Sequence, residues 1–159
     1  MFREMRRFRQ QLGEEDTRAV LSKGSSGVLA LAGDEGYPYA VPQSYVIDGD
    51  ILYFQTATEG HKVDAVKREP KASFCVIDMD CILPDRLTTC YRSAIAFGKM
   101  SIVEDPKEKR YAIEMLVDKY SDKTPEENAA SIDKMWSLLC VLRMDIEHLT
   151  GKQAKELMK

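Results

Sequence analysis

The amino-acid sequence predicts a mainly β fold: an antiparallel β-barrel with peripheral helices, formed by one domain over residues 1–159. Several short apolar runs are joined by tight turns, of which Asp48-Gly49-Asp50 is a clear hairpin signal. Helical patterns are few, and they do not alternate with strands as they do in parallel α/β sheets. A chain of this length can remove enough surface from water to form a substantial core.

The first part of the chain is expected to form a helix and three strands, at residues 14–22, 27–32, 37–47 and 51–56. The third segment contains Pro42, which cannot donate a hydrogen bond to a neighbouring strand. This strand is therefore expected at an edge of the sheet, or bulged at the proline. A bulge would free backbone groups for a ligand, which makes Val41 to Tyr45 a candidate binding segment.

The rest of the chain is expected to form a short helix, two strands, two helices and a last strand, at residues 60–68, 72–78, 91–103, 106–120, 131–136 and 138–146. Residues 79–90 are expected to be irregular, and Ser121 to Asn128 to form a polar loop. Gly98 lies inside a long apolar run and indicates a bend or bulge there.

Composition excludes some classes of function. The chain has 23 Lys and Arg against 26 Asp and Glu, a net charge of −3, so nucleic acid is not an expected partner. No apolar run approaches the ~18 residues that cross a bilayer, and no signal-peptide core is evident. We therefore expect a cytoplasmic protein that does not bind membranes.

The cysteines and histidines do not indicate a metal site. The four cysteines form no CxxC pair, and the chain has two histidines, His61 and His148. Cys75 and Cys140 lie inside apolar runs and are expected in the core. Cys81 and Cys90 lie in the segment expected to be irregular, and the sequence leaves a redox role for them open.

The segment from Tyr53 to Arg68 carries the strongest functional signal. A strand runs into the hydroxyl residues Thr56 and Thr58, turns at Gly60, and enters a short helix that begins with His61-Lys62. Free backbone N–H groups at a helix N-terminus, together with hydroxyls and a cation, favour phosphate. No GxGxxG precedes a helix, so the sequence favours a mononucleotide over a dinucleotide.

Two residues of this segment have more than one reading. Lys62 is either a phosphate ligand or a solvated lysine, and the hydroxyls upstream favour the ligand. His61 either transfers a proton during a reaction or only hydrogen-bonds the cofactor. At the other end of the helix, Asp64 is spaced to pair with Arg68.

Several motifs, taken in order, resemble one known group of proteins. They are Gly-Tyr-Pro-Tyr-Ala-Val-Pro (36–42), Glu-Gly-His-Lys-Val-Asp-Ala-Val-Lys-Arg (59–68), Ser-Phe-Cys-Val-Ile-Asp (73–78), Tyr-Arg-Ser-Ala-Ile-Ala-Phe-Gly (91–98) and Ile-Glu-His-Leu-Thr-Gly-Lys (146–152). Together they resemble the pyridoxamine 5′-phosphate oxidase-related, FMN-binding split-barrel superfamily, and within it most closely the 5-nitroimidazole-resistance (Nim) proteins.

The resemblance implies a six-stranded antiparallel split barrel of Greek-key type and a homodimer with FMN at its interface. It implies that Thr56 to Lys62 hold the phosphate, that Val41 to Tyr45 run beside the flavin ring, and that His61 acts near the flavin. The cofactor-binding residues implied are Val41, Pro42, Ser44, Tyr45, Thr56, Thr58, Gly60, His61, Lys62, Tyr91, Arg92 and Ser93. Arg92 could instead form a salt bridge at an interface, and Trp136 could either stack near the flavin or belong to the core.

By resemblance we expect an FMN-dependent oxidoreductase that reduces a small-molecule electron acceptor such as a nitroaromatic, with His61 as the catalytic proton donor. The alternative is a flavin-binding protein without turnover, acting as a carrier, electron store or sensor. A third reading is haem or a deazaflavin on the same barrel. The resemblance to authentic pyridoxamine phosphate oxidases is weaker, because residues 151–159 lack the arginine and histidine that those enzymes carry near the C-terminus.

Overall fold

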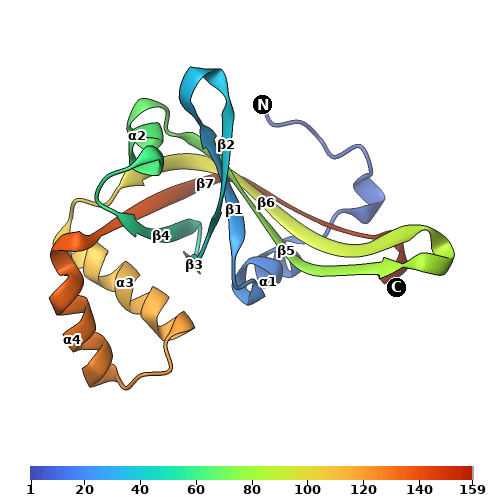
Figure 1. Ribbon diagram of the computed structural model, residues 1–159. Coiled ribbons are helices and arrows are strands. Elements are labelled where there is room, and N and C mark those ends of the chain that lie inside the picture. The colour runs from blue at the N-terminus through green and yellow to red at the C-terminus, as the bar shows by residue number, and fades with distance from the viewer. Residues whose placement is uncertain (159) are drawn as a thin grey trace.

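A computed structural model describes residues 1–158, which form an antiparallel β-sheet curved into an open barrel with helices around it (Figure 1). Within these residues the sheet has seven strands in the order β2-β1-β5-β6-β7-β4-β3. The strands are β1 (Gly27–Ala32), β2 (Pro38–Gln43), β3 (Val46–Asp48), β4 (Ile51–Ala57), β5 (Lys71–Leu83), β6 (Thr88–Ile102) and β7 (Leu139–Gln153). The expected mainly β, antiparallel barrel with peripheral helices is confirmed.

The strand count is seven rather than six because the expected strand over residues 37–47 is divided into β2 and β3. The sheet is not closed: β2 forms one edge and β3 the other. Pro42 lies on the edge strand β2, as its missing N–H requires. The hairpin at Asp48-Gly49-Asp50 is also confirmed, with Gly49 at a positive φ of 57°.

In residues 1–158, four α-helices surround the sheet: α1 (Glu14–Lys23), α2 (His61–Arg68), α3 (Pro106–Tyr120) and α4 (Pro125–Met135). Figure 1 shows α3 and α4 side by side on one flank, with α2 above them at the end of β4. α1 packs against β5, β6 and β7. Among residues 1–158, no helix combines the length and apolar character needed to cross a membrane.

Three expectations of the sequence are wrong at their boundaries. Residues 79–90 are not irregular, because β5 continues to Leu83, the chain turns at 84–87, and β6 begins at Thr88. α4 begins at Pro125 rather than 131, because Thr124 and Glu127 form a reciprocal capping box. The last strand continues to Gln153, because residues 146–153 pair with β6.

Three aromatic rings form the centre of the core. The rings of Phe54 and Tyr45 both meet Phe74 edge to face, with centroids 5.0 and 4.8 Å apart, respectively. The Tyr45 hydroxyl donates to the backbone carbonyl of Leu21, at 2.5 Å. These contacts connect α1, β4 and β5 around one hydrophobic cluster.

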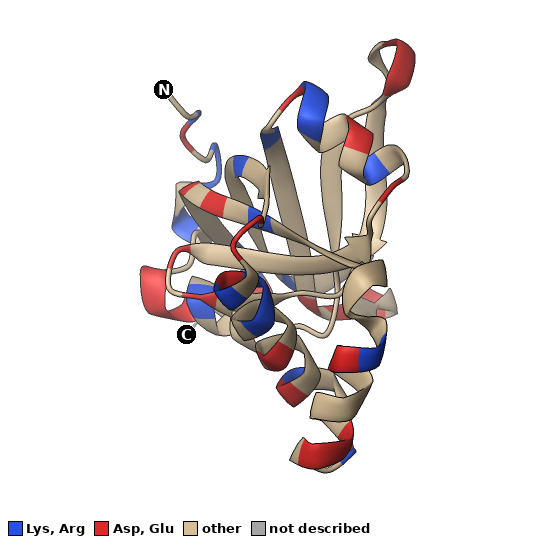
Figure 2. Cartoon of the chain, turned by 90° about the vertical axis from the view of Figure 1, so that its left-hand side faces the viewer, with Lys and Arg blue, Asp and Glu red and all other residues tan. Residues whose placement is uncertain are grey.

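Charged residues of both signs gather on the helices and turns, whereas most of the strand surface is uncharged (Figure 2). One reason is that every second residue along a strand faces the core, where a charged side chain would be unfavourable. Along β6, Ala94, Ala96 and Met100 are buried, while the alternate positions face outward.

Gly98 offers a test of the fold. The pairing of β6 with β7 shifts by one residue between Phe97 and Gly98, which confirms the expected bulge. A Cβ at Gly98 would collide with the backbone carbonyl of Asp145. Gly98→Ala should therefore lower the free energy of unfolding by about 1–3 kcal/mol, as overpacking does. Ser101→Ala, at an exposed position of the same strand, is the control and should change it by less than about 0.5 kcal/mol in the same denaturant titration.

Candidate functional site

The N-terminus of α2 presents unsatisfied backbone donors. Gly60 precedes the helix at φ 122° and ψ 175°, a conformation that essentially only glycine adopts. No side chain caps the helix, and its first backbone bond runs from Asp64 N–H to Gly60 O, at 3.1 Å. Within residues 1–158, the N–H groups of His61, Lys62 and Val63 therefore have no protein acceptor, which leaves them free for an anion.

Lys62 lies beside these donors and is only partly exposed. Its Nζ donates to Gln43 Oε1 at 2.8 Å, and burial lowers the pKa of Lys62 below its ordinary value. Gln43 in turn donates from Nε2 to the backbone carbonyl of Gln55 at 2.9 Å. Gln43 ends β2 and Gln55 belongs to β4, two strands that do not pair, so this one side chain spans the opening of the barrel.

His61 is held against the turn that joins β1 to β2. Its ring stacks on Tyr39, with centroids 3.9 Å apart and planes inclined by 13°, and its Nε2 lies 3.6 Å from Asp34 Oδ2. Arg68 donates to Asp34 at 2.9 Å and to the backbone carbonyl of Ala32 at 2.8 Å. The expected pairing of Arg68 with Asp64 is therefore wrong: both ends of α2 attach to the β1–β2 turn.

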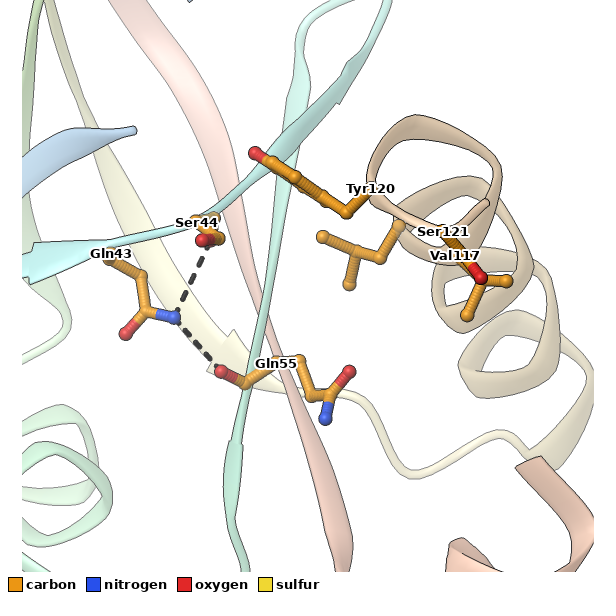
Figure 3. Close-up of a pocket in the computed structure, with 7 residues that line it drawn as sticks. Gln43, Ser44, Gln55, Val117, Tyr120 and Ser121 are labelled. Carbon is orange, nitrogen blue, oxygen red and sulfur yellow. Dashed lines mark hydrogen bonds between the residues drawn. The ribbon is translucent and has the colours of Figure 1, made fainter. Parts of the chain in front are cut away.

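A cavity of about 460 Å³ opens next to Gln43, between the end of β2, β4 and the last turns of α3 (Figure 3). It is lined by Gln43, Ser44, Gln55, Leu116, Val117, Tyr120 and Ser121, none of which carries a formal charge at neutral pH. The Tyr120 hydroxyl accepts from the N–H of Tyr45 at 3.0 Å, which fixes the end of α3 to the link between β2 and β3. The cavity is thus a neutral space with apolar and amide groups, adjacent to the contact between Gln43 and Lys62.

Most of the residues expected near a cofactor lie around this region. Ser44 lines the cavity, Pro42 is exposed on β2, and Thr56 and Thr58 lead from β4 into the turn at Gly60. Val41 is half buried and packs against the main core.

Tyr45 does not fit the expected role. Its side chain is fully buried, its hydroxyl donates to Leu21, and its backbone N–H and carbonyl are bound by Tyr120 and Lys119. Because neither its side chain nor its backbone is free to meet a ligand, Tyr45 is a core residue and does not belong to the site.

Tyr91, Arg92 and Ser93 lie far from Lys62 in the same chain. Arg92 pairs with Gln153 of β7, whereas Gln55, which Gln43 connects to Lys62, pairs with Val141 at the other end of that strand. Twelve residues of extended chain separate these two points, on the order of 35–40 Å if the strand were straight. One mononucleotide bound at Lys62 cannot reach them within one chain.

Arg92 is also engaged elsewhere. It donates to both carboxylate oxygens of Asp78, at 2.7 to 3.1 Å, on the sheet face that carries α1. This hydrogen bonding raises the pKa of Arg92 further. Arg92 therefore forms an ion pair inside its own chain, while Tyr91 and Ser93 lie on the opposite face.

The site residues expected from the sequence do not include Gln43, Gln55 or Tyr120, although Gln43 lies within the candidate segment Val41 to Tyr45. Gln43 stands between two residues that were singled out, Pro42 and Ser44, but an isolated glutamine carries no pattern that predicts its contacts. Tyr120 follows the helical spacing of the apolar residues in α3. That spacing predicts a side chain packed in the core, not one that lines a cavity. A second hydrophobic cluster lies between β4, β7, α3 and α4. Trp136 packs against it, with Lys109 Nζ 4.2 Å from the centre of its ring, and so has a packing role.

Comparison with known proteins defines the family. The family model for pyridoxamine 5′-phosphate oxidase matches residues 13–153, most of the chain. The chain belongs to the pyridoxamine 5′-phosphate oxidase family. The match spans all seven strands and the α2 N-terminus described above. No curated protein matches the chain.

Solved structures share the fold. A candidate 5-nitroimidazole antibiotic resistance protein from Bacteroides thetaiotaomicron is 21% identical, covers 90% of this chain and 86% of its own, and gives a TM-score of 0.74. A conserved hypothetical protein from Mycobacterium tuberculosis is 20% identical with a TM-score of 0.78, over 92% of this chain and 88% of its own. An FAD-binding protein from Mesorhizobium loti is 22% identical with a TM-score of 0.64, over 91% and 97%.

Gln43 provides a test of the site's architecture. Gln43→Leu removes the acceptor for Lys62 and the donor for the Gln55 carbonyl, so it should lower the free energy of unfolding by about 1–3 kcal/mol. Gln43→Glu keeps an acceptor for Lys62 and loses only the donor, so its loss should be smaller. Denaturant titration of both variants measures the difference. A Gln43→Leu protein as stable as the original would show that the side chain does not hold the opening together.

Proposed function

We propose that this protein is an FMN-dependent oxidoreductase that binds the FMN phosphate at the N-terminus of α2. The observation that carries the proposal is the set of three free N–H groups, His61 to Val63, next to the cation of Lys62. A helix N-terminus with a neighbouring lysine stabilises a phosphate through both hydrogen bonds and charge. The hydroxyls of Thr56 and Thr58 precede this position and can add donors.

The neutral cavity beside Gln43 is the proposed place for the flavin ring. Its volume of about 460 Å³ lies within the range of small-molecule sites, roughly 300–1,000 Å³. Leu116 and Val117 offer apolar contact, and the amide of Gln55 and hydroxyl of Ser44 offer hydrogen bonds to the ring edge. When bound, FMN supplies reversible two-electron transfer, and the protein supplies orientation and exclusion of water.

His61 is the proposed proton donor to a reduced small-molecule acceptor. It stands at the phosphate end of the site, its side chain is 40% exposed, and Tyr39 and Asp34 limit its orientation. Exposure lets it recover a proton from water after each reaction. The similarity to a candidate 5-nitroimidazole antibiotic resistance protein supports a nitroaromatic as one class of acceptor.

A second copy of the chain is proposed to complete the site. The outer face of the sheet carries an apolar row, formed by residues that pair across β1, β5 and β6: Val28, Cys75 and Ile95. Val28 and Ile95 are exposed. An apolar sheet face of this kind favours self-association. Tyr91 and Ser93 lie on the same face, so a homodimer built on it could bring them near the partner's cofactor.

A flavin-binding protein without turnover is the alternative function. The exposed His61 favours catalysis, because a carrier has no need of a proton donor at its cofactor site. Steady-state reduction of a nitro or quinone acceptor by a nicotinamide donor separates the two functions. We further propose a cytosolic location, since all four cysteines are free thiols, as is usual in that compartment.

Lys62→Ala should weaken FMN binding. A charge-assisted contact to phosphate contributes about 1.5–3 kcal/mol, so the Kd measured by flavin fluorescence should rise roughly tenfold or more. Because burial lowers the pKa of Lys62, affinity should also fall with rising pH earlier than an ordinary lysine would predict. Lys134→Ala, at an exposed lysine of α4, is the matched control. Equal affinity in all three proteins would place the phosphate elsewhere.

His61→Ala should leave FMN bound and slow reduction of the acceptor. General acid catalysis typically contributes about 10²–10⁴-fold, so kcat should drop by at least the lower value. The FMN content of the purified variant, measured from its absorbance, is the control for binding. Unchanged turnover would remove the proton-donor role.

Ile95→Arg should disrupt the proposed dimer, because it introduces a charge into the apolar row at its β6 end. Sedimentation velocity should then report a monomer. Leu138→Arg alters a residue that is also exposed but lies beside α4, and it should remain dimeric. Dimers of both variants would exclude the apolar row as the interface.

A further inference from the structure

Two thiols face each other on the arm formed by residues 79–83 of β5 and 88–92 of β6. Cys81 and Cys90 are directly opposite in the pairing of the two strands, and both are free. In Figure 1 this arm extends away from α2, α3 and α4, at the end of the molecule where the C-terminus lies.

The backbone fixes the distance between the two residues. The N–H of Ala154 donates to the carbonyl of Tyr91 at 2.8 Å, so the backbone groups of Tyr91 point toward β7. Those of its neighbour Cys90 must then point toward β5, which makes Cys81 and Cys90 a hydrogen-bonded antiparallel pair, with Cα atoms about 5.5 Å apart. Side chains of opposite residues share one face of a sheet, and a Cα separation of about 5.5 Å lies within the roughly 4.4–6.8 Å that disulfides span. The Cβ atoms of a hydrogen-bonded pair are about 5.5 Å apart, however, and those of a disulfide about 3.5–4.5 Å, so the two strands of the arm must move closer for the bond to form. A bond closed against such strain is easily reduced.

The two thiols differ in access to solvent. Cys81 is exposed, whereas Cys90 is 9% exposed. The other two cysteines have no such partner, because Cys75 stands opposite Val28 and Ile95, and Cys140 opposite Thr56. Cys81 and Cys90 are thus a matched pair with one thiol open to reagents and one shielded.

We propose that Cys81 and Cys90 form a reversible disulfide by exchange with low-molecular-weight disulfides of the glutathione class. The Cys81 thiolate attacks one sulfur of the reagent, its S–S bond breaks, and one glutathione thiolate leaves. The Cys90 thiol then loses its proton and attacks Cys81 in the mixed disulfide, releasing the second glutathione. The two protein thiols are oxidised and the reagent is reduced to two thiols.

This site is separate from the proposed cofactor site. Cys90 shares the face of β6 with the buried Ala94 and Ala96, opposite the apolar row of Val28 and Ile95. A dimer on that row therefore leaves the thiols uncovered by it. The disulfide proposal holds whether or not the protein binds FMN.

The test uses the full chain in a Cys75→Ser background, which removes the only other thiol that is not buried. The protein is incubated with oxidised glutathione, and intact mass and peptide mapping follow. The parent should lose two hydrogens without an adduct, and its free thiols should fall from three to one. A Cys81–Cys90 cross-linked peptide should appear, and dithiothreitol should reverse the change.

Single variants test the order of attack. Cys90→Ser should collect one glutathione on Cys81, and Cys81→Ser should remain unmodified. Cys90→Ala gives the same readout if the serine variant unfolds. A parent that only accumulates glutathione adducts, or that stays fully reduced, would overturn the proposal. Equal labelling of the two single variants would overturn the assignment of Cys81 as the attacking thiol.

Discussion

The contact of Gln43 with Lys62 and Gln55 is the interaction on which the rest of the site depends. The sheet is open because β2 and β3 are unpaired edges, and an open edge exposes backbone groups that need partners. Gln43 spans this opening with one donor and one acceptor and holds Lys62 beside the free N–H groups of α2. The same side chain forms a wall of the neutral cavity. The groups proposed to bind the phosphate and the flavin ring therefore lie together at the opening of the barrel.

The length of β6 separates two groups of residues that were expected near the cofactor. One strand carries the expected cofactor residues Tyr91 and Ser93 at one end and reaches the neighbourhood of β4 at the other. The two ends of β6 are too far apart to contact the same ligand within one chain. They could do so only if a second chain brought its Tyr91 and Ser93 close to the first chain's β4. The apolar row on the outer face is a surface on which that can happen. The proposed self-association and the proposed cofactor binding would therefore depend on the same sheet.

The sequence predicted the strands best where burial alternates or a turn is marked by glycine or proline. Pro42 on an edge, Gly49 in a hairpin and Gly98 at a bulge each follow from backbone chemistry that one residue determines. The β5–β6 arm was missed because its side chains are largely exposed and its order comes from hydrogen bonds between strands. Tyr45 was misassigned because its direction depends on contacts with Leu21 and Tyr120, which are distant in the chain. Gln43 was missed for the same reason.

The visible absorption spectrum of the purified protein, with the released cofactor identified by mass, tests whether this site binds FMN. An FMN protein should give flavin absorption bands and release a compound with the mass of FMN, because the phosphate donors and the neutral cavity suit a single mononucleotide. Spectra typical of haem or a deazaflavin, or the mass of FAD, would contradict FMN binding. A colourless protein that also fails to take up added FMN would contradict it most strongly.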